Sequence, residues 1–475
     1  MGCPLPFNSY CAHLILPLSL FHFQASSGEN AALLRKTPIV VPSVRLVVNT
    51  TICQADVMNG LISMFFPRDI PQELCDEIID HVYDDVPTLL ACATTCRSWV
   101  WRSQKNIFRV VSVHNAARFE RFTRLVKSNT RLASYVRVLT IAKARRSKTK
   151  LDKGWPELLS KLPHIEELTL GRWLDLFPKD DAVQRSLPIY LQHVRVLRIS
   201  DSFVGCGEEF ARFLAACPKL RRLDLDNARM WLTMGWESAF EWPVLSGVLT
   251  SLFYRPTHAS GSILRFWTNS PLAANIRKLE LELATPVLFR DCEPLFSATR
   301  GNLEVLVLSV SGKQSPRTQL IHFTPMPLMK RLRHIHMKAN MIDVEKPVAK
   351  QYEWMLCFLH MLGRWEGKGA LEEIILSWRT SDLLDMESAP PWKPFDAALT
   401  ALGKANSKLK FSLNVLDNSG IPDQWLYIAC IGVQLFPTLQ DQKTTLLINM
   451  SSSWRDGEVF GGCLGNSKQY TFQYP

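Results

Sequence analysis

A few residue pairs in this sequence have types and spacings that could do chemistry, but each pattern is incomplete. His334-x-His336 would place two imidazoles on one face of a strand, as in a zinc site, yet no third ligand lies nearby in sequence. Gly363…Gly367-Lys368-Gly369 resembles a phosphate-binding loop but lacks the Ser or Thr that would hold magnesium. Asp224-x-Asp226 lacks the glycine and the distal glutamate of a calcium loop. We therefore expect no catalytic residue, metal or cofactor, with a hydrolase built from scattered residues as an alternative.

The composition favours a folded protein that works in a reducing compartment. Of 475 residues, 47% are apolar and 21% are charged, and the 12 cysteines include no Cys-x-x-Cys pair. Mostly reduced thiols predict the cytosol and/or the nucleus. The net charge of +11 fits an acidic partner without requiring one. Residues 11–23 are apolar, but no Lys or Arg precedes them as in a signal peptide, so secretion is only the alternative.

A motif of the form apolar-x-x-apolar-x-apolar recurs along most of the chain. Its copies begin at residues 136, 165, 194, 220, 249, 276, 303, 332 and 371, with a weaker copy at 409. Most of the intervals are 26–29 residues, and the one from 332 to 371 is 39 residues. Such a period is typical of a repeat architecture and not of independent apolar clusters.

Each repeat contains the patterns of one strand and one helix. The last part of each motif alternates with period two, as in a short strand. Helical apolar patterns follow at 208–217 and 351–363, and at Phe395, Leu399 and Leu402. One strand and one helix per repeat predict a right-handed β–α solenoid with a parallel sheet over residues 113–450. An ordinary α/β domain with leucine-rich strands is the alternative.

The repeats resemble the leucine-rich repeat family. The copy at 332 fits the family pattern best, through Leu332, Ile335, Met337, Asn340 and Ile342. Most other copies lack the Asn or Cys that forms the family's buried polar ladder. The resemblance therefore implies an irregular solenoid with an incomplete ladder.

The stretch before the repeats predicts three short helices. Asp69 can cap a first helix that Pro71 enters, and apolar residues then recur at Leu74, Ile78 and Val82. Pro87 marks the start of a second helix, and a third runs through 97–105 with Trp99 facing inward. Three helices of this size bury little surface, so the unit needs the solenoid or a partner for support.

This stretch resembles an F-box. The family pattern is met by Ile70-Pro71, Glu73-Leu74, Ile78, Leu89-Leu90 and Cys96-Arg97-x-Trp99, with Ile70 and Thr95 as departures. An F-box followed by leucine-rich repeats is a known arrangement, and the chain resembles in particular the F-box-like proteins of mushroom-type fungi. The expected organisation is a poorly ordered extension at 1–66, the F-box-like domain at 67–112, the solenoid, and an unassigned tail at 451–475.

The resemblance implies a Skp-type adaptor as partner and, through it, a cullin-based ubiquitin ligase. The residues expected to face the adaptor are Ile70, Pro71, Leu74, Ile78 and Leu89. Cys96 and Trp99 are expected in the core of the three-helix unit. A helical cap of the solenoid that binds no partner is the alternative.

Strand parity predicts the surface for a substrate. If motif positions 4 and 6 point into the core, positions 3 and 5 point to the open face of the sheet. The residues expected to bind the substrate are Glu167, Arg198, Arg222, Phe253, Lys278, His334, His336 and Glu373. Mixed charges with some apolar groups suit a protein substrate better than nucleic acid, so we expect no nucleic-acid partner. No apolar run reaches the ~18–20 residues of a membrane span, so we expect no membrane partner either. The expected function is a non-catalytic substrate receptor, and the alternatives are an interaction scaffold without a ligase role and a solvated face without a ligand.

Overall fold

The regularly spaced motifs form neighbouring strands of one sheet. The computed structural model describes residues 71–142, 151–173, 181–231, 249–256, 261–283, 288–310, 326–339, 348–379, 392–416, 436–440, 446–451 and 468–472, all of which belong to the unit Pro71–Pro475. The ten motif copies correspond to strands β2 to β11 in unbroken order. The expectation of a disordered extension at 1–66 lies outside the described residues.

The described sheet has 13 strands whose spatial order is their order in the sequence, β1 to β13. Strands β1 to β12 are parallel, and β13 pairs with β12 in the antiparallel direction. The strands are β1 (Val110–Val113), β2 (Val138–Ala142), β3 (Glu167–Gly171), β4 (Val196–Ser200), β5 (Arg222–Asp226), β6 (Ser251–Arg255), β7 (Lys278–Leu283), β8 (Val305–Val310), β9 (His334–Ala339), β10 (Glu373–Arg379), β11 (Lys410–Leu416), β12 (Leu446–Ser451) and β13 (Lys468–Phe472).

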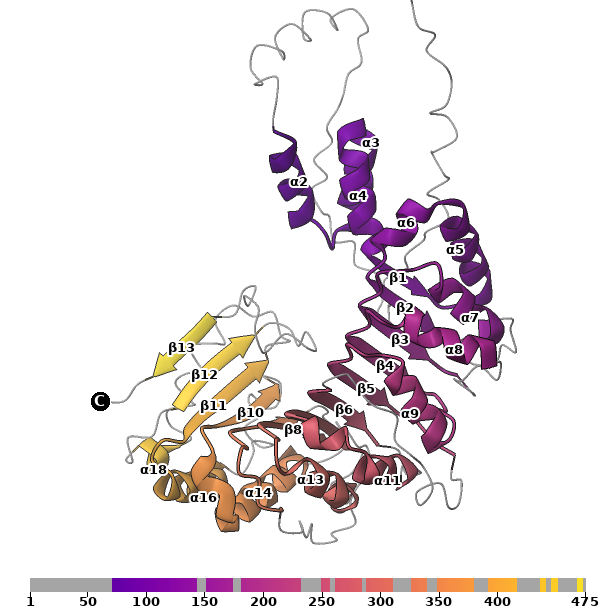
Figure 1. Ribbon diagram of the computed structural model, residues 1–475. Coiled ribbons are helices and arrows are strands. Elements are labelled where there is room, and N and C mark those ends of the chain that lie inside the picture. The colour runs from indigo at the N-terminus through magenta and orange to yellow at the C-terminus, as the bar shows by residue number, and fades with distance from the viewer. Residues whose placement is uncertain are drawn as a thin grey trace, which may run out of the picture. The chain divides into compact units, whose positions relative to one another are not determined.

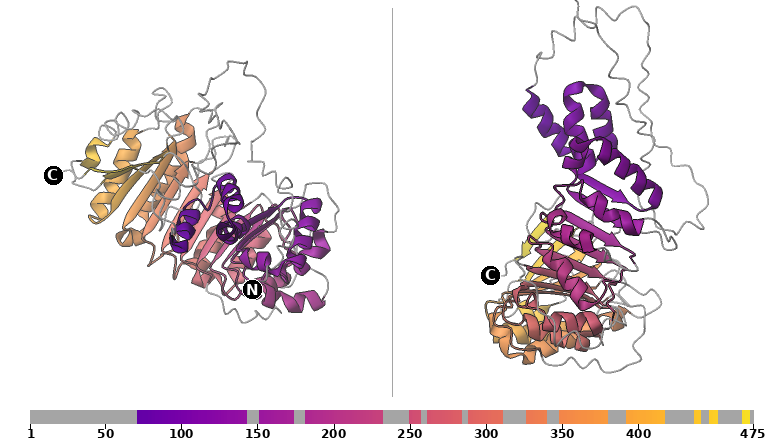
Figure 2. Two further views of the ribbon diagram at one scale, coloured as in Figure 1. Left: turned by 90° about the horizontal axis from the view of Figure 1, so that it is seen from above. Right: turned by 45° about the vertical axis from the view of Figure 1, so that its right-hand side comes forward.

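Three helices precede the sheet, α2 (Gln72–His81), α3 (Val86–Thr95) and α4 (Arg97–Arg109). The helices that follow are α5 (Ala116–Ser128), α6 (Thr130–Tyr135), α7 (Leu151–Leu159), α8 (Asp181–Tyr190), α9 (Gly207–Ala215), α11 (Gly261–Asn269), η2 (Ala273–Asn275), α12 (Leu288–Asp291), α13 (Glu293–Thr299), α14 (Val348–Arg364), η3 (Glu366–Ala370), α16 (Trp392–Ala405) and α18 (Pro437–Gln440). Figures 1 and 2 show the connecting helices on one side of the sheet, which leaves its other face open.

Strand alternation separates the core from the open face as expected. Motif positions 4 and 6, such as Leu168 and Leu170 on β3, are fully buried, and the helices cover this side. The helices supply large aromatic side chains, including Phe210 on α9, Phe266 on α11 and Phe358 on α14. One continuous apolar cluster therefore runs from β1 to β12.

The buried Ser202 side chain links the backbones of two neighbouring repeats. Its side chain is 1% exposed, and its hydroxyl donates to the Ser200 carbonyl (2.7 Å) and accepts from the Trp173 amide (3.0 Å). The residues just after β3, β4 and β5 have positive φ angles, at Arg172 (63°), Asp201 (49°) and Asn227 (54°). The same left-handed turn is thus repeated in three successive repeats, and Asp and Asn tolerate it well.

The sequence patterns did not predict three of the strands. β1 lies at the expected boundary between the helical unit and the solenoid, and β12 and β13 extend the sheet beyond the last motif copy. β13 lies in the tail that had no assigned structure.

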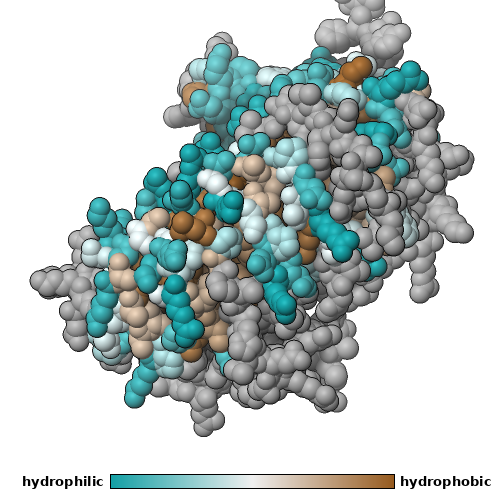
Figure 3. All heavy atoms as spheres, turned by 60° about the horizontal axis from the view of Figure 1, so that its bottom comes forward, coloured by the Kyte–Doolittle hydropathy of each residue, from teal (hydrophilic) through white to brown (hydrophobic). Residues whose placement is uncertain are grey.

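The space-filling view in Figure 3 shows small apolar areas interspersed with hydrophilic ones.

Candidate functional site

Helix α2 has two apolar strips that lie side by side on its surface, one buried and one exposed. It buries Cys75 and Ile79 against its own unit, whereas Leu74 and Ile78 are 50% and 56% exposed. The two exposed residues are four positions apart and so lie above one another on the helix surface. With the exposed Pro71, they form the apolar edge of α2. Exposed apolar side chains on one helix face are typical of a helix-docking surface.

Three of the five residues expected to face an adaptor lie on this edge: Pro71, Leu74 and Ile78. Ile70 lies outside the described residues. The expectation for Leu89 was wrong, because its side chain is 0% exposed. Leu89 lies on α3, which packs along α4, so it stabilises the three-helix unit and presents no surface.

A polar cluster fixes α2 to α4. Asp80 on α2 accepts from Arg102 Nε (2.7 Å) and from Asn106 Nδ2 (2.9 Å), and Asn106 is buried. The hydrogen bond with Arg102 lowers the pKa of Asp80. At the other end of the helix, the Gln72 side chain reaches the Ser98 carbonyl (3.5 Å). These contacts set which side of α2 faces outward.

The expectation that Cys96 lies in the core was also wrong. Its side chain is exposed at the N-terminal end of α4, and Trp99 is only partly buried. The Cys96 Sγ lies 3.1 Å from the Ser98 Oγ, and this hydrogen bond lowers the pKa of the thiol. Cys96 occupies the N-cap position of α4, and its side chain makes no capping hydrogen bond to the helix.

We expect Cys96 to react with iodoacetamide at about pH 8 well before Cys217 and Cys292 do. Thiolates are the reactive form, and burial raises the pKa of Cys217 and of Cys292 to about 12. Peptide mapping by mass spectrometry after timed labelling measures the order. Equally fast labelling of Cys217 in the native protein would show that its site is open to solvent.

The open face of the sheet carries rows of side chains that the parallel register aligns, and two of these rows contain the predicted residues. The first row follows motif position 3 and contains Glu167, Val196, Arg222, Ser251, Lys278, Val305, His334 and Glu373. The second row follows position 5 and contains Thr169, Arg198, Asp224, Phe253, Glu280, Val307, His336 and Ile375. All eight residues expected to meet a substrate lie in these two rows.

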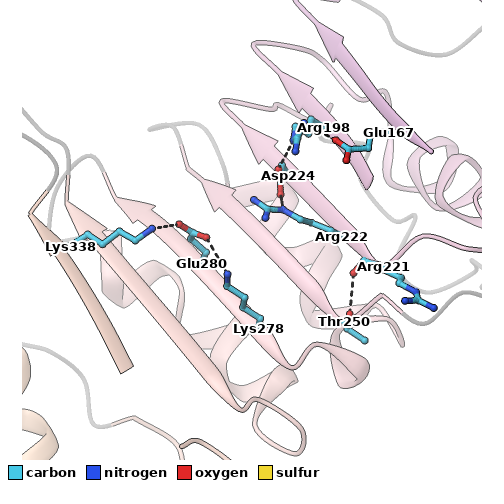
Figure 4. Close-up of polar contacts among 9 residues, drawn as sticks. All are labelled: Glu167, Arg198, Arg221, Arg222, Asp224, Thr250, Lys278, Glu280 and Lys338. Atoms are coloured by element: carbon cyan, nitrogen blue, oxygen red, sulfur yellow. Dashed lines mark hydrogen bonds and ion pairs between the residues drawn. The ribbon is translucent and has the colours of Figure 1, made fainter. Parts of the chain in front are cut away.

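The charges of β3 to β5 form a chain of ion pairs across the open face (Figure 4). Arg198 lies 3.2 Å from Glu167 and 3.1 Å from Asp224, and Asp224 also lies 2.8 Å from Arg222. Asp224 is 7% exposed and sits between the two guanidinium groups. A carboxylate with so little access to water must be paired with cations. These ion pairs therefore hold the side chains of Arg198 and Arg222 in place on the sheet.

A second cluster lies on β7 and β9, where Glu280 is 2.9 Å from Lys338 and 4.0 Å from Lys278. Burial lowers the pKa of Lys278, and Glu280 acts in the opposite direction.

A third cluster lies one step further along the strands, where Arg255 joins Asp226 (2.9 Å) and Glu282 (2.5 Å). Burial raises the pKa of Asp226 in spite of Arg255.

Four residues of these clusters were not predicted as site residues: Asp226, Arg255, Glu282 and Lys338. They occupy position 7 of the motif, which the same alternation assigns to the open face.

The open face is electrically balanced. The three clusters contain five cations, Arg198, Arg222, Arg255, Lys278 and Lys338, and five carboxylates, Glu167, Asp224, Asp226, Glu280 and Glu282. Phe253 is half-buried among them, with the Arg255 guanidinium 6.0 Å from its ring. Such a surface is selective for a partner with a matching charge pattern and does not attract one sign of charge.

The two histidines lie on the same strand face but in different surroundings. His334 Nδ1 lies 3.4 Å from Glu373, and Glu373 also accepts from Ser412 Oγ (2.6 Å). His336 is 3% exposed, and its Nε2 lies 2.6 Å from Ser377 Oγ. His336 is therefore too buried to meet a substrate, contrary to expectation. Burial lowers its pKa well below the ordinary value, and Lys338 and Lys278 add to this effect.

Within the described ranges, no group of three or more His, Cys, Asp or Glu side chains could hold a metal ion. None of the helices in those ranges is both long and apolar enough to cross a membrane. The fold and the two surfaces define a repeat protein with a parallel sheet and an open, charge-balanced face. No protein-family model matches the sequence. No curated protein is significantly similar to it either.

Proposed function

We propose that the chain is the substrate-recognition subunit of a Skp–cullin–F-box type ubiquitin ligase. In this proposal α2 to α4 form an F-box, and the apolar edge of α2 binds a Skp-type adaptor. The observation that carries the proposal is the exposure of Leu74 and Ile78 on a helix that buries its other apolar side. A helix of a partner protein would bury these exposed apolar side chains and so stabilise the short three-helix unit.

We further propose that the parallel repeats are of the leucine-rich type. The near-constant interval between strands and the Leu or Ile residues at the core positions support this assignment. Ser202, which bonds backbone groups of neighbouring turns, supports it as a substitute for the missing ladder Asn.

The open face is the proposed substrate surface. Its partly exposed charged residues, including Glu167, Arg198, Arg222, Lys278 and Glu373, suit a protein with complementary charges, with Phe253 and His334 between them. The receptor adds no acid–base chemistry. It holds the substrate near the ubiquitin-loaded subunit and so raises the effective concentration of the reacting groups. Such a receptor would act in the cytosol and/or the nucleus.

The test is retention of a purified Skp-type adaptor on the immobilised full chain. We expect the wild type to retain it and the variant Leu74→Asp, Ile78→Asp to lose at least about 10-fold in affinity, since each change places a charge in an apolar contact. The matched control is Ile189→Asp, Leu328→Asp, which changes two exposed apolar residues (66% and 45% exposed) outside α2.

Retention by the wild type and the control but not by the α2 variant supports the proposal. Equal retention by all three proteins, or by none of them, rejects it. The second outcome would favour a repeat scaffold that binds proteins through its open face without a ligase role.

A further inference from the structure

The positive charge of this protein is concentrated in one short region. Residues 97–150 contain 15 Lys and Arg and a single acidic residue, Glu120, for a net charge of +14. The whole chain has a net charge of +11, so all other residues together hold 40 basic and 43 acidic residues and are slightly negative. Ten of the 15 cations lie in the described residues 97–142, on or between α4, α5, α6 and β2.

Helix α5 turns its cations outward. It buries Phe119, Phe122 and Val126 against the repeats, while Arg121 and Arg124 are exposed on the opposite side. The three-residue step between the two arginines places them next to each other on the helix surface. Packing of the apolar side of α5 therefore leaves its basic side exposed to solvent.

Helices α4 and α6 continue this surface. α6 packs against both α4 and α5, and the exposed Arg131 on α6 donates to Gln104 on α4 (3.3 Å). The carbonyl of Arg109, at the end of α4, accepts from the Arg137 amide, which brings the end of α6 to β1. We call Arg109, Arg121, Arg124 and Arg131, all exposed, the basic helical surface.

These cations are not neutralised as those of the open face are. Arg121 and Arg124 have no ion-pair partner among the described residues, whereas all five cations of the open-face clusters do. Lys127, near the end of α5, pairs with Glu157 on α7 (2.6 Å). Neighbouring like charges repel, so an unpaired group of arginines is most stable when an anionic partner covers it.

The kind of partner follows from what the basic helical surface lacks. Among the described residues, α5 and α6 expose no large apolar side chain, and the exposed ones nearest to this surface are Trp101 on α4 (37%) and Val110 next to Arg109 (51%). A protein interface usually has an apolar core, and a membrane-binding helix inserts apolar side chains. A phosphodiester backbone needs only cations and hydrogen-bond donors, and arginine binds phosphate through two parallel hydrogen bonds.

We infer that the basic helical surface of α4 to α6 binds the phosphate backbone of nucleic acid without reading its sequence. The expectation against nucleic acid rested on the charge-balanced open face, which is a different surface. The apolar edge of α2 is also separate, since acidic residues such as Glu73 and Glu77 flank it. This inference does not depend on the proposed ligase function.

The test measures binding of the full chain to a fluorescent DNA duplex of about 20 base pairs by anisotropy, as a function of KCl concentration. The variant is Arg121→Glu, Arg124→Glu, Arg131→Glu. The control, Arg265→Glu, Arg290→Glu, Arg300→Glu, makes the same change in net charge at three exposed arginines on or next to α11, α12 and α13. Circular dichroism checks that both variants are folded.

We expect the wild type and the control to bind within about 2-fold of each other and the variant to bind at least ~10-fold more weakly at low salt. The slope of log K against log salt should fall by about 2–3 in the variant, since three phosphate contacts are lost. Equal binding by variant and control overturns the inference, as does no binding by the wild type. Binding to phosphatidylserine vesicles or to polyglutamate, but not to the duplex, also overturns it and assigns the surface to a membrane or to an acidic protein.

Discussion

Replacing Trp155 by alanine is expected to lower the free energy of unfolding by about 3–5 kcal/mol, the range for deleting a large buried aromatic ring. Trp155 lies on α7 with 1% of its surface exposed. Its ring contacts Trp173 edge-to-face (6.2 Å between centroids) and Phe213 at 6.4 Å. Trp173 follows β3 and Phe213 lies on α9, so the three rings connect successive repeats. The cavity left by Trp155→Ala would weaken the packing between these repeats.

The matched control is Trp231→Ala, which deletes the same side chain at a position that is 55% exposed. Trp231 stacks on Phe203 (4.7 Å between centroids), so its loss should cost no more than about 1 kcal/mol. Denaturant unfolding, followed by fluorescence and by circular dichroism, measures both changes. Similar losses in the two variants would contradict the placement of Trp155 in the core.

Acidification below about pH 6.5 is expected to destabilise the protein through His336. Burial holds the pKa of folded His336 well below its ordinary value of 6.5, which applies to the unfolded chain. Between these two pKa values the unfolded chain binds more protons than the folded one. The stabilisation is therefore present above pH 6.5 and is lost as the pH falls toward the folded pKa, by at most about 1.4 kcal/mol per pH unit.

The measurement is the free energy of unfolding at about pH 7 and about pH 5 for the wild type and for His336→Gln. The variant has no titrating group at this position, so the loss of stability between the two pH values should be smaller than in the wild type. His360→Gln makes the same substitution at an exposed position and serves as the control for the change in composition. An unchanged pH dependence in His336→Gln would assign the acid sensitivity to other groups.

The sequence predicted most of the sheet because one short motif determines each strand. Residues such as Leu197 and Ile199 on β4 must be buried together, and alternation then places Val196 and Arg198 on the open face. Among the helices between the strands, α9, α14 and α16 were located for the same reason, as α9 buries Phe210, Phe213 and Leu214 on one side. β1, β12 and β13 were missed because the motif does not extend over them.

Accessibility was the part that the sequence could not predict. Alternation assigns a side chain to a face of the sheet but not to solvent, so Arg198 and His336 occupy equivalent positions with different burial. Val307, His336 and Ile375 are all nearly buried on the open face of β8 to β10, whereas Thr169 and Phe253 are half-buried. Leu89 and Cys96 show the same limit in the helical unit, where burial depends on how α3 meets α4.

The unbroken order of the strands determines how the protein tolerates a change in length. Each strand hydrogen-bonds only to the strands that come before and after it in the sequence. Each connection therefore leaves one repeat, which we call a level of the stack, and enters the next one. The 39-residue interval before β10 shows that a long excursion leaves the neighbouring pairings in place, with β10 in register with β9 from Glu373↔His334 onward. Adding or removing whole repeats would then change the length of the sheet. The pairing of the remaining strands would stay the same.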